Sequence, residues 1–219
     1  MPRTTARRIW VTAAAIVAVV FGAVIVLISR RDDGPDRALA DTSAPAVVRD
    51  DSRRLNSPPD AVVTFVEFLD FECEGCRAAY PVVEQLRADY GDRVEFVLRY
   101  FPLPGHVNGE RAARAVEAAA QQGRLEAMYR TMYETQAQWG ERRTPADDVF
   151  RGFAAELGLD MAAYDAAYAD PATAERIQVD VDDGMALGVQ GTPTFFVNGE
   201  QVSPRAVDDL RTAIENGLR

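Results

Sequence analysis

The sequence predicts an α/β fold in which a block of helices is inserted between the two halves of one sheet. Three observations support this prediction. Strand patterns occur at residues 62–69 and 94–98 with a helical pattern between them, residues 108–188 show helical spacing, and another strand pattern begins at Thr194. Because strands lie on both sides of the helical block, we expect that block to be an insertion into one domain.

The first half is expected to run strand, helix, strand. The apolar run Val62–Leu69 is typical of a buried strand, and a helical pattern begins at Arg77, directly after two cysteines. Alternating apolar residues at 94–98 predict a second strand, which ends at Pro102.

The helical block at about 108–188 is divided by recognisable start and stop signals. Gly123 ends its first helix, Thr144-Pro145 begins its third, Asp160 caps a short one, and Asp170-Pro171 begins the last, which ends before Gly188.

The second half is expected to be a hairpin followed by a closing helix. Asn198-Gly199 is a hairpin turn signal, and Ser203-Pro204 marks the start of the closing helix. Helical spacing places Val207 on the inward face of this helix and Met185 on the inward face of the helix before the hairpin.

Cys73 and Cys76, the only cysteines in the sequence, indicate a redox-active site. They lie where a helix is expected to begin. Unpaired backbone N–H groups and the positive end of the helix dipole favour a thiolate at Cys73, which would then be a nucleophile near neutral pH. Cys76, one turn later, can attack a mixed disulfide and release the substrate.

Three other interpretations of the cysteine pair remain open. A structural disulfide would close a loop of about four residues, worth at most roughly 2 kcal/mol. A zinc site usually needs four Cys or His ligands, and the sequence offers only Cys73, Cys76 and His106. The two residues could also be unreactive core thiols.

A second signal lies far along the chain, where Gly191-Thr192-Pro193-Thr194 precedes an apolar strand. Together with Val-Glu-Phe-Leu-Asp-Phe-Glu-Cys-Glu-Gly-Cys and with Phe101-Pro102-Leu103, this segment resembles the DsbA-like thiol–disulfide oxidoreductases, which have a thioredoxin fold. The resemblance covers roughly Asp60 to Leu218. It implies a thioredoxin fold with an inserted helical subdomain.

The resemblance also implies roles for individual residues. Pro193 is expected to be cis and to face the cysteine pair, leaving nearby backbone groups free to bind an extended substrate, and Thr192 is expected at the same site. Glu67 is expected as a buried acid beneath the pair. Burial would raise its pKa and suit it to exchange a proton with Cys76, although its face of the strand could also be solvated.

The dipeptide between the cysteines, Glu74-Gly75, differs from the Pro-His of the best-known strong oxidants in that family. Asp70, Glu72 and Glu74 are expected to surround the site with negative charge, each worth roughly 1 kcal/mol at about 7 Å. We therefore predict a less acidic Cys73 and a less oxidising pair than in those proteins. His106, the only histidine, is expected to be a hydrogen-bonding or solvated loop residue.

The N-terminal segment predicts a membrane anchor. Ile9 to Ile28 contains no charged residue over a length that spans a bilayer as a helix, and arginines flank both ends. We expect residues 1–8 to be a cytoplasmic tail, 9–28 a single transmembrane helix, 29–57 a flexible linker and 58–218 an extracytoplasmic domain. A cleaved signal peptide and a secreted form is the alternative. A short strand at 46–49 could pair with the sheet edge.

Charge argues against nucleic acid as a partner. Residues 1–31 hold five arginines and no acid, which leaves 19 arginines against 34 acids in the remainder.

The sequence therefore favours a membrane-tethered enzyme that forms disulfides in exported proteins, with no cofactor and no metal. The resemblance implies reoxidation by a quinone-linked integral-membrane partner. The alternative is a reductase or isomerase that uses the same site, and a third hypothesis is a non-catalytic thioredoxin-fold binding module.

Overall fold

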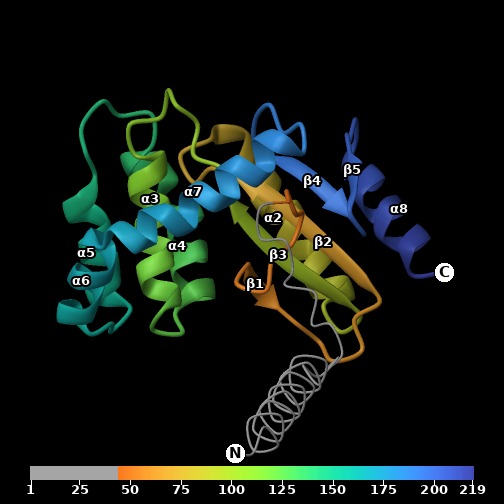
Figure 1. Ribbon diagram of the computed structural model, residues 1–219, viewed down its shortest axis with the longest axis horizontal. Coiled ribbons are helices and arrows are strands. Elements are labelled where there is room, and N and C mark those ends of the chain that lie inside the picture. Colours follow the sequence, from red (N-terminus) through yellow and green to blue (C-terminus); the bar gives the residue numbers. More distant parts are fainter. Residues whose placement is uncertain (1–43) are drawn as a thin grey trace, which may run out of the picture. The chain divides into compact units, whose positions relative to one another are not determined.

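The computed structural model describes residues 44–219 (Figure 1). Its sheet has five strands in the order β1-β3-β2-β4-β5. The strands are β1 (Arg53–Asn56), β2 (Val63–Leu69), β3 (Val94–Tyr100), β4 (Thr194–Val197) and β5 (Glu200–Val202). The helices are α2 (Glu74–Tyr90), α3 (Gly109–Ala120), α4 (Leu125–Trp139), α5 (Asp147–Glu156), α6 (Met161–Ala169), α7 (Pro171–Ala186) and α8 (Val207–Gly217).

The two halves of the sheet meet at β2. This strand pairs in parallel with β3, with Glu67 opposite Leu98 and Phe68 opposite Arg99. On its other side β2 pairs antiparallel with β4, where Glu67 lies opposite Phe195. The parallel pair is joined by α2, as a parallel connection requires a crossover.

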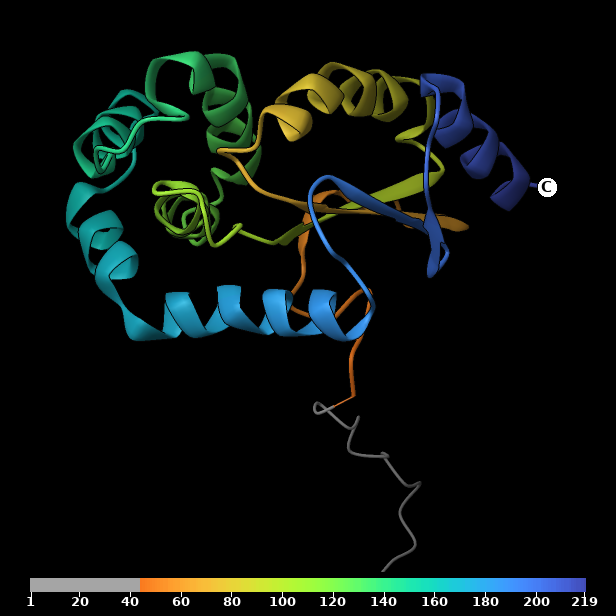
Figure 2. The ribbon, with the colours of Figure 1, turned by 90° about the horizontal axis from the view of Figure 1, so that it is seen from above.

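Helices cover both faces of the sheet, which is why β2 and β3 are buried nearly throughout. One face packs on α2 and α8, with Val83 and Leu210 in the same apolar cluster as Phe65. The other face packs on α7, where Phe68 meets Val181. Figure 2 shows α7 on the side of the sheet opposite to α2 and α8.

The block α3–α7 occupies the predicted insertion, so the α/β order with an inserted helical subdomain is confirmed. Its core contains Met128, Trp139 and Phe150, and Trp139 meets Phe150 edge-on at 4.8 Å between ring centroids. The Asp160 carboxylate caps α6 and the Asp170 carboxylate caps α7, as their sequence signals predicted.

Several boundaries differ from the prediction. The segment expected to be flexible linker contains β1, which pairs antiparallel with β3, whereas residues 46–49 form no strand. Arg53 and Arg54 of β1 pair with Glu117 and Glu95, so this charged strand is held by side chains as well as by its backbone. The folded part therefore begins before residue 58.

The closing helix α8 begins at Val207, later than Ser203-Pro204 suggested, because the Asp209 carboxylate accepts hydrogen bonds from the backbone N–H groups of Arg205 and Ala206. The inward positions predicted for Met185 and Val207 are wrong, since both side chains are more than half exposed at 57% and 60%.

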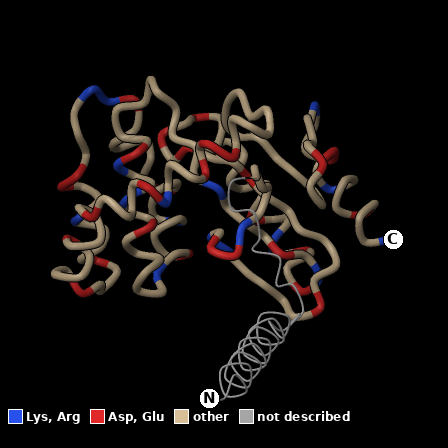
Figure 3. Tube along the Cα trace, in the orientation of Figure 1, with Lys and Arg blue, Asp and Glu red and all other residues tan. Residues whose placement is uncertain are grey.

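No helix within residues 44–219 is both long enough and apolar enough to span a bilayer. The predicted tail at 1–8, the predicted anchor at 9–28 and most of the predicted linker lie outside the described residues. Acidic residues occur along the whole of the described chain, from the helical block to α8 (Figure 3).

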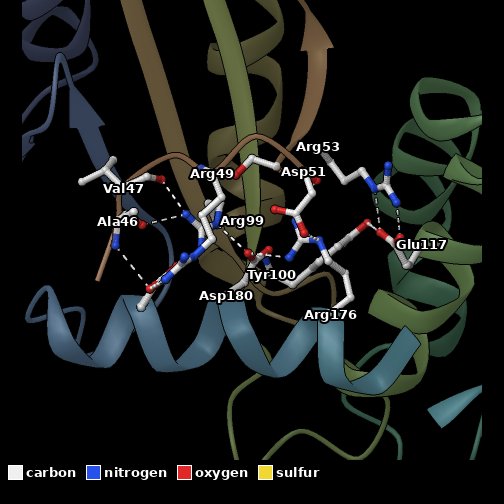
Figure 4. A network of polar contacts seen from close by, with 12 residues as sticks. Ala46, Val47, Arg49, Asp51, Arg53, Arg99, Tyr100, Glu117, Arg176 and Asp180 are labelled. Atoms are coloured by element: carbon white, nitrogen blue, oxygen red, sulfur yellow. Dashed lines mark hydrogen bonds and ion pairs between the residues drawn. The ribbon is translucent and has the colours of Figure 1, made fainter. Parts of the chain in front are cut away.

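A buried ionic network joins the α7 face of the sheet to the segment before β1 (Figure 4). Arg99 of β3 is fully buried and donates to the carboxylates of Asp180 at 2.6 Å and Asp183 at 2.5 Å, both on α7. Its remaining nitrogen donates to the carbonyl oxygens of Ala46 and Val47. The fold thus fixes residues 46–47 through a side chain of the central sheet.

Candidate active site

Cys73 caps the N-terminus of α2, and Cys76 lies in the first turn of this helix. The backbone N–H of Cys73 donates to the Asp70 carbonyl at 3.1 Å, which folds the chain tightly between β2 and α2. Both cysteines are free thiols. Cys73 is 9% exposed and Cys76 is fully buried, so of the two only Cys73 is open to attack from outside.

The Thr192–Pro193 peptide lies against the cysteine pair and is cis, as expected from the resemblance. The Cys73 thiol donates to the Thr192 carbonyl oxygen at 3.3 Å. A Cβ atom added to Gly75 would lie 3.3 Å from Pro193 Cδ and 3.5 Å from Cys73 Sγ. Glycine at position 75 therefore allows the two distant segments to approach closely. Glu74, beside it, is exposed to solvent.

The two thiols have opposite acidities. The pKa of Cys73 is lowered from its ordinary value of 9.0 to about 5, chiefly because its thiolate accepts a hydrogen bond from the Cys76 thiol. Burial opposes this effect, and the Thr192 side chain and the backbone N–H groups of Gly75 and Cys76 support it. Burial raises the pKa of Cys76 well above its ordinary value, and its hydrogen bond to Cys73 raises it further. The site thus holds one ready nucleophile and one protonated partner.

Glu67 lies in β2 on the face that packs against α2, and it is 4% exposed. Burial raises its pKa from 4.5 to about 8, with smaller contributions from the negative charges of Cys73 and Glu84. Glu67 Oε1 is buried and has no hydrogen-bond partner within residues 44–219. The solvated alternative for this position is therefore wrong, and the expected buried acid is present.

The acids expected to surround Cys73 are partly engaged elsewhere. The Asp70 carboxylate accepts hydrogen bonds from the backbone N–H groups of Glu72 and Leu103 and lies 2.6 Å from His106 Nδ1. The Glu72 carboxylate accepts from the Asn108 N–H at 2.6 Å. Both carboxylates therefore hold the loop after β3 to the active-site turn. We infer that they oppose the Cys73 thiolate less than their position in the sequence suggested.

The structure adds residues that the sequence did not indicate. Gln136 of α4 is buried, and its Nε2 donates to the carbonyl oxygens of Phe71 at 2.7 Å and Cys73 at 3.0 Å. Tyr133, one turn earlier, packs its ring against Phe71 with centroids 5.2 Å apart. Both lie about 60 residues from the cysteines, and no local pattern links a glutamine in a helix to a distant carbonyl group.

The arrangement suits thiol–disulfide exchange and offers little to a metal ion. Among residues 44–219, no group of three or more His, Cys, Asp or Glu side chains is placed to hold a metal. The acidic, accessible sulfur of Cys73 can form a mixed disulfide, and the buried Cys76 can resolve it. The buried Glu67 and the cis Thr192–Pro193 peptide complete the site.

Known proteins resemble the chain in sequence and in structure. The family described as Thioredoxin matches residues 57–216. A thioredoxin-like oxidoreductase from Silicibacter pomeroyi DSS-3 superimposes with a TM-score of 0.65 and 28% identity, over 78% of this chain and 94% of that chain. BdbD from Bacillus subtilis, in its oxidised form, shares the fold with a TM-score of 0.66 and 22% identity, over 76% of this chain and 92% of that one.

The curated proteins that match the chain in sequence are named as Na(+)/H(+) antiporters. The Na(+)/H(+) antiporter NhaA of Herminiimonas arsenicoxydans is 39% identical over 158 residues, which are 72% of this chain and 24% of that protein. The Na(+)/H(+) antiporter NhaA 3 of Salinispora tropica is 37% identical over 83% of this chain and 27% of its own length. The chain spans about a quarter of the length of these relatives.

Proposed function

Since this chain belongs to the thioredoxin family, we propose that it is a DsbA-like thiol–disulfide oxidoreductase that exchanges its Cys73–Cys76 disulfide with exported proteins. The single observation that carries this proposal is the contrast between the two thiols. Cys73 lies at the N-terminus of α2 against the cis Thr192–Pro193 peptide, whereas Cys76 is fully buried, and the pKa of Cys73 is lowered while that of Cys76 is raised. A non-catalytic binding module would have no use for that contrast.

The reaction is proposed to begin from the oxidised pair. A substrate thiolate attacks Cys73 Sγ, a bond forms between these two sulfurs, and the Cys73–Cys76 bond breaks. Cys76 leaves as a thiolate and takes up a proton from Glu67, a buried acid whose pKa of about 8 suits the transfer and whose charge raises the pKa of Cys76. A second substrate thiolate then attacks the substrate sulfur, and Cys73 leaves as a stable thiolate. The substrate is oxidised and the pair is reduced.

The oxidising direction is supported by the acidity of Cys73. A stable thiolate stabilises the reduced pair, and this makes the disulfide a stronger oxidant. The pKa of about 5 lies above the value of about 3.5 that accompanies the strongest oxidants. We expect a reduction potential between about −120 mV, as in the strong oxidants, and about −270 mV, as in thioredoxin. A value at the thioredoxin end would favour the reductase or isomerase alternative.

Substrate binding is proposed at the edge beside Thr192–Pro193. The Thr192 carbonyl oxygen accepts only the Cys73 thiol among the contacts described, so it can accept a hydrogen bond from an extended substrate strand once Cys73 is oxidised.

We place the redox domain outside the cytoplasm, attached to the membrane through Ile9 to Ile28, with reoxidation by a quinone-linked membrane protein. These proposals depend on the apolar run and on the DsbA-like resemblance. Membrane extraction at alkaline pH and protection of the domain from external protease would test them. A domain that resists protease in cells stripped to the cytoplasmic membrane, and is cut only when that membrane is opened, would contradict the location.

The activity is tested by the oxidation of a reduced two-cysteine peptide in single turnover, with Cys73→Ser as the control. We expect about one disulfide per wild-type molecule and none with the variant. Insulin reduction by the reduced protein tests the reverse direction. Absence of both reactions in the folded wild-type protein would exclude the enzyme and favour a binding module.

A further inference from the structure

Beside the cysteine pair lie four buried polar atoms that lack a hydrogen-bond partner within the part of the chain that the structure describes. They are Glu67 Oε1, Thr192 Oγ1 and the hydroxyl oxygens of Tyr129 and Tyr133. Thr192 adjoins Cys73, whereas the other three belong to β2 and α4. Buried polar groups are nearly always paired, so four such groups in one place call for an explanation. The reaction proposed above does not use the two tyrosines.

The tyrosine rings pack against the elements that carry the site. Tyr129 and Tyr133 of α4 contact each other edge-on, with ring centroids 5.2 Å apart. Tyr133 also stacks on Tyr80 at 5.1 Å. Tyr80 follows Cys76 by four residues on α2 and so lies on the same face of that helix. The pair on α4 is thereby held next to the resolving cysteine.

The pKa values of the two tyrosines respond to different charged neighbours. Burial raises the pKa of Tyr133, and the next contributions come from the negative charges of Cys76 and Glu67. Burial also raises the pKa of Tyr129, where the next contributions come from Glu67 and Glu84. The charge of Cys76 thus acts on Tyr133 and that of Glu84 on Tyr129, while Glu67 acts on both.

Glu84, in turn, belongs to an ion pair that reaches solvent. Arg87 Nη1 donates to Glu84 at 2.7 Å, and the Glu84 side chain is 27% exposed. Other charged groups shift the pKa values of these residues as well. Cys73 raises that of Glu67, and Asp70 raises that of Tyr133. For Tyr129, Arg87 lowers the pKa and Tyr80 raises it.

We propose that Tyr133 and Tyr129, joined by internal water, form a proton relay between the Cys76–Glu67 pair and the surface at Glu84. This inference rests on the proposed function, because it concerns the proton that Cys76 exchanges during each half-reaction. When Cys76 leaves the disulfide, it takes the proton of Glu67, and the relay returns one proton from solvent to Glu67. When Cys76 attacks a mixed disulfide, the same proton leaves by the same path.

A relay is needed because neither Cys76 nor Glu67, the two groups that exchange the proton, is in contact with bulk water. Cys76 is 0% exposed and Glu67 is 4% exposed. A hydroxyl group both donates and accepts, so it passes a proton along a chain of hydrogen bonds without holding a charge itself. The raised pKa of each tyrosine keeps its hydroxyl protonated and able to donate.

The test is the rate at which Cys76 resolves a mixed disulfide, measured from pH 5 to 9. Reduced protein is mixed with oxidised glutathione, quenched with acid, and the decay of the Cys73–glutathione adduct is followed by mass. Tyr133→Phe and Tyr129→Phe keep the ring and remove the hydroxyl. We expect each to slow the decay about tenfold below pH 8, which is less than the roughly 100-fold or more that a direct general acid or base contributes, because each hydroxyl acts only through Glu67. The pKa of Cys73 should not change.

The matched control is Tyr164→Phe. Its hydroxyl is also buried and without a hydrogen-bond partner among the described residues, but it lies on α6, away from the cysteines. This variant should reproduce the wild-type profile. In a Glu67→Gln background, Tyr133→Phe should add no further slowing, because the relay then leads to no acid.

The outcomes separate the two proposals. A wild-type protein that neither forms nor resolves the adduct overturns the proposed function, and the relay with it. Normal wild-type exchange with unchanged profiles in both tyrosine variants overturns the relay alone, and so does equal slowing in Tyr164→Phe. If Tyr133→Phe does not fold, Tyr129→Phe decides between these outcomes.

Discussion

Two buried polar residues lie on opposite faces of the same sheet, and their surroundings differ. Glu67 of β2 faces α2, whereas Arg99 of β3, opposite Phe68, faces α7. Arg99 donates to two carboxylates and two carbonyl groups, and its guanidinium lies 5.2 Å from the centre of the Phe68 ring. Glu67 has an oxygen without any partner among residues 44–219.

This difference separates a structural site from a reactive one. A buried charge whose hydrogen bonds are all made holds its neighbours in place and does not change state readily. A buried acid without compensation has its pKa moved toward neutral pH, which suits it for proton exchange. The protein tolerates the unpaired acid beside its cysteines and keeps the paired network on the other face.

Arg99→Met should have the largest effect on stability. It leaves Asp180 and Asp183 with fewer partners in a buried position, and breaking such a network typically costs about 3–5 kcal/mol. Urea unfolding of residues 44–219 and of the full chain measures the loss. Arg151→Met is the control, because its pair with Asp165 is exposed, and it should leave the unfolding midpoint unchanged. Equal effects of the two variants would show that burial does not distinguish them.

Glu67→Gln should act in the opposite direction. The folded pKa of Glu67, about 8, exceeds its ordinary value of 4.5, so the folded state loses stability as pH rises between these values. The amide removes this cost, and we expect a gain of about 3–4 kcal/mol at pH 8, two to three pKa units of 1.36 kcal/mol each. The gain should vanish below pH 4.

Urea unfolding of the reduced variant across pH 4–9 measures this effect, and the same protein should exchange disulfides more slowly. A loss of stability at pH 8 would mean that Glu67 has partners when ionised and that the comparison with Arg99 fails.

The Cys73 thiolate should contribute less to the free energy of unfolding, and only in the reduced protein. Its folded pKa of about 5 lies below its ordinary value of 9.0, so the thiolate stabilises the reduced form above pH 9, and this contribution falls away as pH decreases through 5. At pH 7 the contribution is about 2 kcal/mol, after allowance for partial exposure. Thiolate absorbance against pH locates the transition, and Cys73→Ser should abolish it. A transition near pH 9 would remove the reason for an oxidising role.

The sequence was sufficient for the reactive side of this comparison and not for the structural side. Cys73-x-x-Cys76 and Thr192-Pro193 are each recognisable from a few neighbouring residues. The structure places both at the site that these motifs predicted. Arg99 directly follows the alternating residues 94–98, and nothing in that pattern indicates that its side chain is buried. Its burial depends on α7, which packs on the sheet about 80 residues later in the chain.

The same limit applies to the other residues that the sequence did not identify. β1 is rich in arginine, and its pairing with β3 depends on acids that lie 41 and 64 residues away. Gln136 and the tyrosines of α4 reach the site only because the helical insertion folds back on α2. Fold class follows from patterns within one element, whereas these contacts follow from how separate elements pack.

The Asp70–His106 pair should contribute least to the free energy of unfolding, because it is partly exposed to solvent. Asp70 is buried, but the His106 side chain is 21% exposed. Burial lowers the pKa of His106, but the hydrogen bond and the negative charge of Asp70 outweigh this, and the net shift is upward. The pair therefore stabilises the protein fully below about pH 6.5, and the contribution disappears as pH rises through the raised pKa. His106→Gln should cost less than about 1 kcal/mol at pH 5 and nothing at pH 9. If the cost persists at pH 9, His106 acts through a neutral hydrogen bond to Asp70, and charge plays no part in how this loop is held.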